Sequence, residues 1–308
     1  MIERSLLRGI VTPMVTPLRP DGQTVHETGV HQLVERLIQQ GVHGLFVGGT
    51  TGEVWALDDA QWARLVRFAV EACRGRVPLY AGVSHPSTAG AVARARQAEQ
   101  LGADVVVSLP PYYVPPSQAD IVGHFQALAA ATALPVMIYQ FPGIAKTSVA
   151  LSTYAELAAI PGVVGVKDSL CDVTEFRHMI NLLRGQGQDF RLFLGSDILV
   201  DVAVLLGAQG AVPSISNVLA PLLVEAYEAA TMGQWERSHV AITRVCDLKA
   251  IYRVAPTESF FDGFIAGLKC ALELLGVEAG PPAAPIPACN TEQRKALESL
   301  LQKGGVLA

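Results

Sequence analysis

The strongest constraint on the fold of this chain is a recurrence of short apolar runs rich in β-branched residues. Consecutive runs start about 19 to 35 residues apart, which leaves room for one helix and two loops between them. Several runs are apolar at consecutive positions, as expected of strands covered on both faces. The pattern predicts a strand–helix unit repeated eight times. The eight runs are GIVTPMV from Gly9, GLFVGG from Gly44, VPLYAGV from Val77, DVVVSLP from Asp104, PVMIY from Pro135, GVVGVK from Gly162, RLFLG from Arg191 and GAVPS from Gly210.

Eight strands with eight crossovers favour a closed barrel over an open, doubly wound sheet, partly because no G-x-G-x-x-G follows the first run. We therefore predict an α/β fold with a (β/α)₈ TIM barrel over residues 1–224. After about Val224 the strand signal disappears. Residues 225–308 are predicted to form a C-terminal helical region, with helices near 225–252, 258–276 and 291–302.

Composition excludes several classes of function. With 308 residues, half of them hydrophobic, most of the chain can bury a core and is not disordered. The net charge of −5 offers no basic surface for a phosphate backbone, so we expect no nucleic-acid partner. Two stretches without charged residues, 121–145 and 202–224, are interrupted by prolines, glycines and polar residues, so we expect no membrane span.

The chain termini and cysteines indicate a reducing compartment. The first residues lack the apolar core and cleavage site of a signal peptide, so a cytoplasmic protein is expected. The five cysteines are scattered and form no C-x-x-C pair, which predicts reduced thiols and no zinc site.

In a barrel of this kind, functional side chains gather where the strands end. The residues that close the eight runs are Thr16, the segment GGTTGE at 48–53, Ser84, Tyr112 and Tyr113, Tyr139, Lys167, the triplet Gly195, Ser196 and Asp197, and Ser214.

Lys167 is the most informative of these residues. The other five lysines stand in polar, loop or helical surroundings, whereas the alternation in GVVGVK aims Lys167 into the barrel mouth. Burying a charge costs several kcal/mol unless it is paired or neutralised. Removal from water favours the neutral amine, which can attack a ketone to form a Schiff base. The alternative is an ion pair with Asp168.

Tyr139 closes the preceding run. Adjacent strand ends in a barrel lie ~5 Å apart, so its phenol can reach the same substrate atoms as the lysine amine and move protons between them. The alternative is a packed ring with a satisfied hydroxyl.

The segment GGTTGE exposes backbone N–H groups beside the hydroxyls of Thr50 and Thr51, which suits a carboxylate. It lacks the Gly-Lys-Ser/Thr ending of a P-loop. The pair Tyr112 and Tyr113 is either an oligomer contact or part of the catalytic site.

Together, GGTTGE, PPYY, the tyrosine ending the fifth run and the GVK ending the sixth resemble the dihydrodipicolinate synthase / N-acetylneuraminate lyase family of class I, pyruvate-dependent aldolases. The resemblance covers Gly9 to about Leu275. It implies a barrel with C-terminal helices, a homotetramer built from two tight dimers, a pyruvate or 2-keto acid substrate, and no metal or organic cofactor.

The resemblance also implies roles for individual residues. Lys167 would form the Schiff base and Tyr139 would be the proton shuttle. Thr50 and Tyr113 would extend a proton relay, with Tyr113 reaching in from the neighbouring subunit. The pyruvate carboxylate would be held by Thr51 and the amides around Thr50. The other implied substrate-binding residues are Gly49, Val212, Ser169, Gly195, Asp197 and Ser214, and Asp197 has an alternative role as a helix N-cap.

The substrate branch depends on the segment after Tyr139. Dihydrodipicolinate synthases have an arginine there that grips the carboxylate of the incoming aldehyde, and Ile144 stands at that position. Loss of this clamp removes a contact worth ~1.5–3 kcal/mol. Lys146 is either a substitute for it or a surface lysine. The phrase YxFP and the segment GVKDSLCDVTEFRHMI look more like the 2-keto-3-deoxygluconate aldolase branch.

We therefore expect a lyase that reversibly cleaves a 2-keto-3-deoxy sugar acid to pyruvate and an aldehyde. Three alternatives stay open. The first is dihydrodipicolinate synthase, which joins pyruvate to aspartate semialdehyde. The second is a dehydratase or deaminase of the same family, and the third is a non-catalytic sensor that binds a keto acid.

Overall fold

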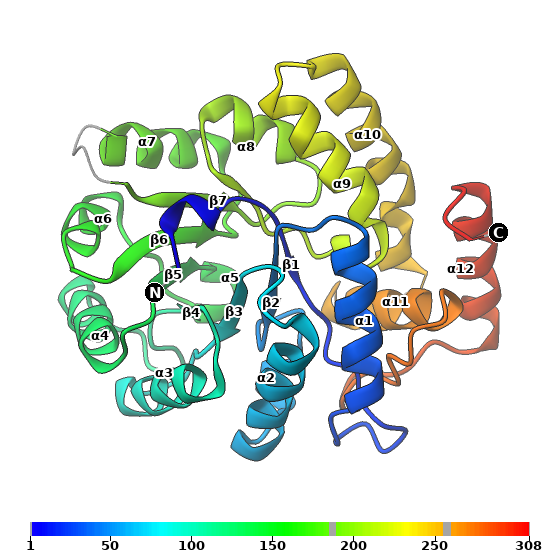
Figure 1. Cartoon of the computed structure of the whole chain (residues 1–308), viewed down its shortest axis with the longest axis horizontal. Helices are drawn as coiled ribbons and strands as arrows, with labels where there is room; N and C mark the ends of the chain where they lie inside the picture. The colour runs from blue at the N-terminus through cyan, green and yellow to red at the C-terminus, as the bar shows by residue number, and fades with distance from the viewer. Residues whose placement is uncertain (1, 185–188, 255–259, 308) are drawn as a thin grey trace.

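The eight predicted runs form one closed, parallel barrel in which each strand pairs with its neighbours in sequence order. The structure is a computed structural model and describes residues 2–184, 189–254 and 260–307, without the side chains of 260–262. The predicted (β/α)₈ barrel with C-terminal helices is confirmed (Figure 1). The strands are β1 (Gly9–Pro13), β2 (Gly44–Val47), β3 (Leu79–Gly82), β4 (Val105–Ser108), β5 (Val136–Gln140), β6 (Val163–Asp168), β7 (Arg191–Leu194) and β8 (Gly210–Ala211).

A ring of helices surrounds the strands, and α11 and α12 lie to one side of the ring (Figure 1). The ring contains α1 (Glu27–Gln39), α2 (Asp59–Cys73), α3 (Thr88–Leu101), α4 (Gln118–Ala131), α6 (Leu151–Ala158), α7 (Val173–Arg184), α8 (Val200–Leu206) and α9 (Ser216–Thr231). The helix α5 (Pro142–Ala145) follows β5, and the C-terminal part contains α10 (Trp235–Leu248), α11 (Phe260–Leu274) and α12 (Thr291–Lys303). Three 3₁₀ segments complete the chain: η1 (Arg4–Leu6), η2 (Val54–Ala56) and η3 (Lys249–Arg253).

The single helix predicted near 225–252 is wrong. The chain leaves α9 at Thr231, turns at Gly233 with a φ of +73°, and continues as α10 and η3. The predicted boundary between residues 224 and 225 falls inside α9. The helix predicted near 258–276 corresponds to α11, with positions 258 and 259 outside the described residues, and the helix predicted near 291–302 corresponds to α12.

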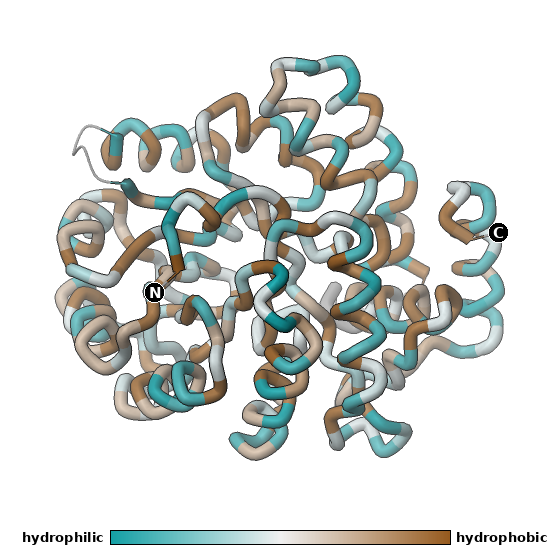
Figure 2. Tube along the Cα trace, in the orientation of Figure 1, coloured by the Kyte–Doolittle hydropathy of each residue, from teal (hydrophilic) through white to brown (hydrophobic). Residues whose placement is uncertain are grey.

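Two apolar layers hold the barrel together. One fills the interior of the barrel and includes Val11, Phe46, Val107 and Phe193. The other lies between the strands and the helices and takes up the apolar stripe of each helix. Brown segments on the strands and on the inner helix faces in Figure 2 follow this arrangement. Strands that are covered on both faces explain the consecutive apolar residues of the runs.

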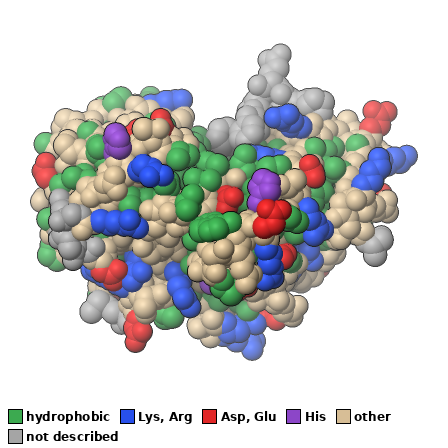
Figure 3. Space-filling model, turned by 90° about the horizontal axis from the view of Figure 1, so that it is seen from above, with side chains coloured by type: hydrophobic (Ala, Val, Ile, Leu, Met, Phe, Trp, Pro, Cys, Tyr) green, Lys and Arg blue, Asp and Glu red, His purple; other side chains and the backbone are tan. Residues whose placement is uncertain are grey.

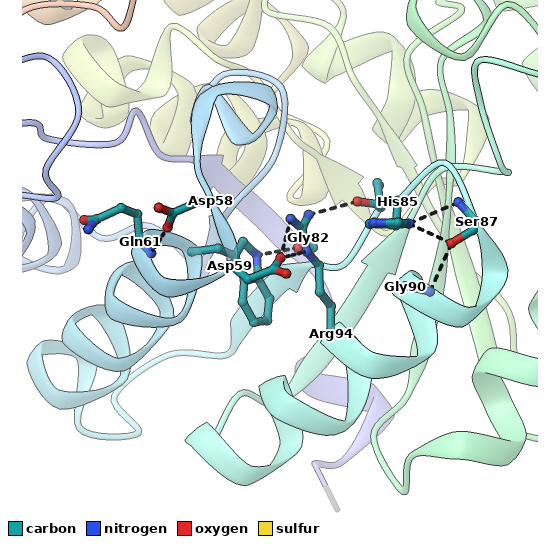
Figure 4. Close-up of polar contacts among 10 residues, drawn as sticks. Asp58, Asp59, Gln61, Gly82, His85, Ser87, Gly90 and Arg94 are labelled. Carbon is teal, nitrogen blue, oxygen red and sulfur yellow. Dashed lines mark hydrogen bonds and ion pairs between the residues drawn. The ribbon is translucent and has the colours of Figure 1, made fainter.

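Arg94 of α3 fixes the loops at one end of the barrel, the end to which the strands point. Its guanidinium donates to Asp59 at the start of α2 and to the carbonyl of Ser84 (Figure 4). It also lies over the ring of Trp62, whose Nε1 donates to the carbonyl of Gly82 at 2.8 Å. These contacts tie the segments after β2 and β3 to each other.

No helix among the described residues has the length and apolarity needed to cross a membrane. On the face seen in Figure 3, basic and acidic side chains are interspersed.

A buried carboxyl group ends β6. Asp168 is 1% exposed, and its Oδ1 accepts a hydrogen bond from the Leu170 amide at 2.9 Å. Burial raises the pKa of the Asp168 carboxyl to about 6, and the charges of Glu175 and Asp172 also raise it. Between about pH 4 and 6, Asp168 is therefore still protonated in the folded chain but already ionised in the unfolded chain.

The ionised Asp168 is thus a cost to folding that grows as the pH rises through this interval. We predict that Asp168→Asn, which keeps an acceptor for Leu170, gains stability relative to the parent by about 2–3 kcal/mol between pH 4 and pH 7. Denaturant unfolding of both proteins at several pH values measures the difference.

Asp120→Asn is the control with the opposite sign, because hydrogen bonds from Ser117 lower the pKa of the exposed Asp120 carboxyl. Asp120→Asn should be less stable than the parent at neutral pH, and this difference in stability should shrink as the pH falls. A stability difference for Asp168→Asn that is the same at every pH would contradict the prediction.

Candidate active site

Tyr139 and Lys167 are direct neighbours across the pairing of β5 with β6. Their side chains are 3% and 5% exposed, and the Lys167 Nζ lies 4.0 Å from the centroid of the Tyr139 ring. The same nitrogen lies 5.0 Å from the centroid of the Phe46 ring on β2. The parallel register therefore brings an amine and a phenol together in surroundings that exclude most water.

Within the described residues, Lys167 forms no ion pair. Asp168 follows it directly, but side chains alternate along a strand and its carboxylate is bound to the amide of Leu170. The alternative role of Lys167, an ion pair with Asp168, is therefore not found. The amine is held among aromatic rings without a counter-charge.

A cavity of about 400 Å³ opens at this end of the barrel and holds most of the predicted site residues. These residues come from the ends of several strands and from the loops that follow them. The predicted residues that line the cavity are Thr50, Thr51, Tyr139, Lys167, Ser169, Gly195, Asp197, Val212 and Ser214.

The loop after β2 presents its two threonines to opposite sides of the cavity. The Thr50 hydroxyl lies 3.4 Å from the Tyr139 hydroxyl, and the Thr51 hydroxyl lies 2.9 Å from that of Ser214. Thr51 is 4% exposed. Gly49 does not line the cavity. It lies behind the threonines, where an added Cβ would come within 2.8 Å of the Phe46 ring.

Tyr113 lies outside the cavity of this single chain. It stands on the loop after β4, is 91% exposed and has a φ of +78°. A left-handed backbone at a large side chain is unusual, and the ring is exposed to solvent. Ile144 and Lys146 do not line the cavity either. The Lys146 ammonium donates to the carbonyl of Gly143 at 2.9 Å.

Asp197 lines the cavity together with Lys249 and Tyr252, and we call this part the far wall. Its Oδ1 accepts from the Ile215 amide at 3.0 Å and its Oδ2 from the Tyr252 hydroxyl at 3.0 Å. The Lys249 Nζ lies 3.9 Å from Oδ2. The alternative role of Asp197 as a helix N-cap is wrong, because Leu199 occupies that position in α8.

Reasoning from strand ends missed the part of the wall that comes from the C-terminal region and from loop interiors. The missed lining residues include Phe141, Cys171, Lys249, Tyr252 and Phe264. Lys249 and Tyr252 belong to η3 and Phe264 to α11. No rule about strand ends can find residues on helices that follow the last strand.

One of the five lysines expected in polar, loop or helical surroundings, Lys269, is helical as expected, but it is also buried, which the sequence analysis did not predict. This residue lies on α11 but is 1% exposed and pairs with Glu53, the last residue of GGTTGE, which is 0% exposed. A sequence signal was present, because Lys269 interrupts the apolar segment FIAGLKCALELL.

Comparisons with known proteins give relatives that match nearly the whole chain. The chain is 34% identical over 301 residues to an uncharacterized DapA-like lyase of Halobacterium salinarum, covering 98% of this chain and 95% of that protein. Dihydrodipicolinate synthase from Bacteroides thetaiotaomicron superposes with a TM-score of 0.91 at 33% identity, over 96% of this chain and 98% of that one.

A further solved structure was determined with pyruvate. It is YagE of E. coli K12, a prophage protein of the dihydrodipicolinic acid synthase family, with a TM-score of 0.90 at 26% identity over 98% of this chain and 99% of that one. The profile of the dihydrodipicolinate synthetase family matches residues 6–304. The chain therefore belongs to the dihydrodipicolinate synthetase family.

Proposed function

We propose that this protein is a class I aldolase that cleaves a 2-keto-3-deoxy sugar acid to pyruvate and an aldehyde, in a reversible reaction, through a Schiff base on Lys167. The observation that carries the proposal is the buried amine of Lys167, which lies against the phenol of Tyr139 and has no ionic partner among the described residues. A lysine amine beside a phenol at the mouth of a barrel places a nucleophile next to a group that can transfer protons.

In the proposed reaction, the amine adds to the keto carbon of the substrate. The hydroxyl of the adduct takes a proton from solvent and leaves as water, which gives an iminium ion. The Tyr139 hydroxyl accepts the proton of the substrate's C4 hydroxyl while it passes its own proton to the Thr50 hydroxyl, and the electrons of the C3–C4 bond move to the iminium nitrogen. The aldehyde leaves and the resulting enamine is protonated at C3. Hydrolysis then releases pyruvate and restores the amine.

The loop after β2 has two tasks in this proposal. Thr51 and the amides around Thr50 hold the carboxylate, since a turn of exposed amides with hydroxyls suits a planar anion. The Thr50 hydroxyl lies 3.4 Å from the Tyr139 hydroxyl and continues the proton path. Tyr113 of a neighbouring subunit would complete the path in a homotetramer, and its exposure on the loop after β4 supports this role.

The charge balance of the cavity supports a substrate with one carboxylate. Among the described lining residues, Lys167 and Lys249 are the basic groups and Asp197 is the acidic one. Because Lys249 lies beside Asp197, the far end is nearly neutral. The cavity wall also offers hydroxyls of Ser169, Ser196 and Ser214 to the hydroxyls of a sugar acid.

Dihydrodipicolinate synthase activity is the second candidate, because solved relatives carry that name. It requires a group that binds the carboxylate of the incoming aldehyde. Ile144 provides no such group, and the Lys146 amine is bound to Gly143 outside the cavity. These contacts favour the sugar-acid substrate.

The first test is reductive trapping. Borohydride with pyruvate should add one pyruvate-derived mass to Lys167, because reduction converts the imine to a stable secondary amine. Peptide mass mapping locates the adduct. Lys167→Met should abolish it, and Lys146→Met should leave it unchanged. An adduct on any other lysine, or none, would overturn the assignment of the nucleophile.

The second test separates proton transfer from imine formation. We predict that Tyr139→Phe lowers turnover by ~10²–10⁴, since the proton shuttle is lost, while the pyruvate imine is still trapped. Tyr154→Phe is the matched control, because Tyr154 is also buried and lies on α6 outside the cavity. Equal effects of the two substitutions on turnover would argue against the shuttle.

The third test identifies the substrate. We expect condensation of pyruvate with hydroxylated, uncharged aldehydes such as glyceraldehyde, and little product with aspartate semialdehyde. Product analysis with 2-keto-3-deoxy acids should give pyruvate. A product that keeps all carbons and loses water or ammonia would indicate a dehydratase or deaminase. Binding without any product would indicate a sensor.

A further inference from the structure

A buried ion pair outside the cavity connects the threonine loop to the C-terminal region. Glu53 directly follows Thr50, Thr51 and Gly52, and its Oε2 lies 2.5 Å from the Nζ of Lys269 on α11. Its Oε1 accepts from the amide of Ala283 at 2.6 Å. Three segments that are distant in sequence therefore meet at one carboxylate.

Burial disfavours the charged forms of both residues in this pair. Glu53 is 0% exposed and Lys269 is 1% exposed. Burial raises the pKa of the Glu53 carboxyl and lowers the pKa of the Lys269 amine, in each case against the effect of the partner's charge. Buried pairs of this kind often stabilise a fold no better than apolar residues of the same volume. The contribution to fold stability alone is thus a weak explanation for the pair.

The pair is instead well placed to hold the turn at 49–53 in one conformation. The Glu53 amide donates to the carbonyl of Thr50 at 3.1 Å, and the Gly52 amide donates to the carbonyl of Gly49 at 3.1 Å. Glu53 itself has a φ of +53°, a left-handed conformation that a residue with a side chain adopts at a cost. The contacts of its carboxylate hold the turn in this conformation.

Lys269 is fixed in turn from the other side. Its Nζ donates to the carbonyl of Pro281 at 2.9 Å, two residues before the amide that binds Glu53. Helix α11 and the segment at 281–283 therefore hold the carboxylate together. Any movement of Glu53 requires both partners to give up a buried polar contact.

The position of the turn determines where the two threonine hydroxyls lie. Thr50 reaches the Tyr139 hydroxyl at 3.4 Å and Thr51 reaches Ser214 at 2.9 Å. A displacement of about 1 Å in a site of this kind can cost about 10²-fold in rate. A relaxed turn would move both hydroxyls while leaving Lys167 on its strand.

We propose that Glu53 and Lys269 are positioning residues, which act through the turn at 49–53 to hold Thr50 and Thr51 at the carboxylate and proton-transfer positions of the site. The inference rests on the proposed function. It makes the C-terminal region a determinant of catalytic geometry through a contact outside the cavity.

The decisive variant is the double substitution Glu53→Gln with Lys269→Met. Glutamine keeps an acceptor for Ala283 and methionine fills the volume of the lysine stem, so both charges disappear together. Lys269→Met alone leaves a buried carboxylate without its partner and should lower the melting temperature. The double variant should regain most of that loss, because no charge is left uncompensated.

If the pair positions the threonines, the double variant stays impaired although it is stable. We expect kcat lower by about 10- to 100-fold and a higher KM for pyruvate, with the pyruvate adduct still trapped on Lys167. If the pair serves only stability, the double variant recovers parental kcat and KM, and the inference fails. Arg237→Met is the control. It removes the exposed pair of Arg237 with Glu225 in the same region and should change neither constant.

A mutant cycle tests whether the effect passes through the threonine loop. Combined with Thr51→Val, the double substitution should add little to the rise in KM for pyruvate, since the hydroxyl it positions is already absent. Full additivity would mean that the pair acts elsewhere. The trapping experiment on the unmodified protein distinguishes the two proposals. If the unmodified protein forms no pyruvate adduct, the proposed function is overturned. If the adduct forms but the double variant has the same kcat and KM as the unmodified protein, only this inference is overturned.

Discussion

Closure of the eight-stranded sheet is the constraint on which the rest of the structure depends. The ring closes where Gly9 lies against Gly210, and a Cβ on Gly210 would come within 2.1 Å of the Gly9 carbonyl oxygen. Once closed, all eight strands end at one rim, and the register of β5 with β6 sets Tyr139 beside Lys167. The placement of Tyr139 beside Lys167 is therefore a consequence of backbone pairing.

The ionisable side chains at the rim differ in their hydrogen-bond partners. Asp168 is held by a backbone amide and Asp197 by an amide and a phenol. Lys167 has no such partner among the described residues and is surrounded by aromatic rings. Because each carboxylate is occupied elsewhere, the amine remains available to an incoming carbonyl carbon, which is the property that the proposed chemistry needs.

The C-terminal helices contribute to function from two directions. Lys249 and Tyr252 complete the far wall of the cavity, next to Asp197. Lys269 reaches the threonine loop from behind, through Glu53. An appendage to a closed barrel could pack anywhere on its surface. Here it reaches the rim at two places, the cavity wall and the back of the threonine loop.

The sequence by itself determined the barrel, the strand ends and most of the strand-end residues that line the cavity, because period, spacing and apolar runs are local properties of the chain. It could also indicate that Lys167 and Tyr139 lie close together, since all strands of a closed parallel barrel end at the same rim. Tertiary structure alone decided that Tyr113 lies outside its own cavity, that Asp197 binds Tyr252, and that Lys269 pairs with Glu53. Those outcomes depend on how separate segments pack in three dimensions, and no local pattern encodes the partner of a buried charge.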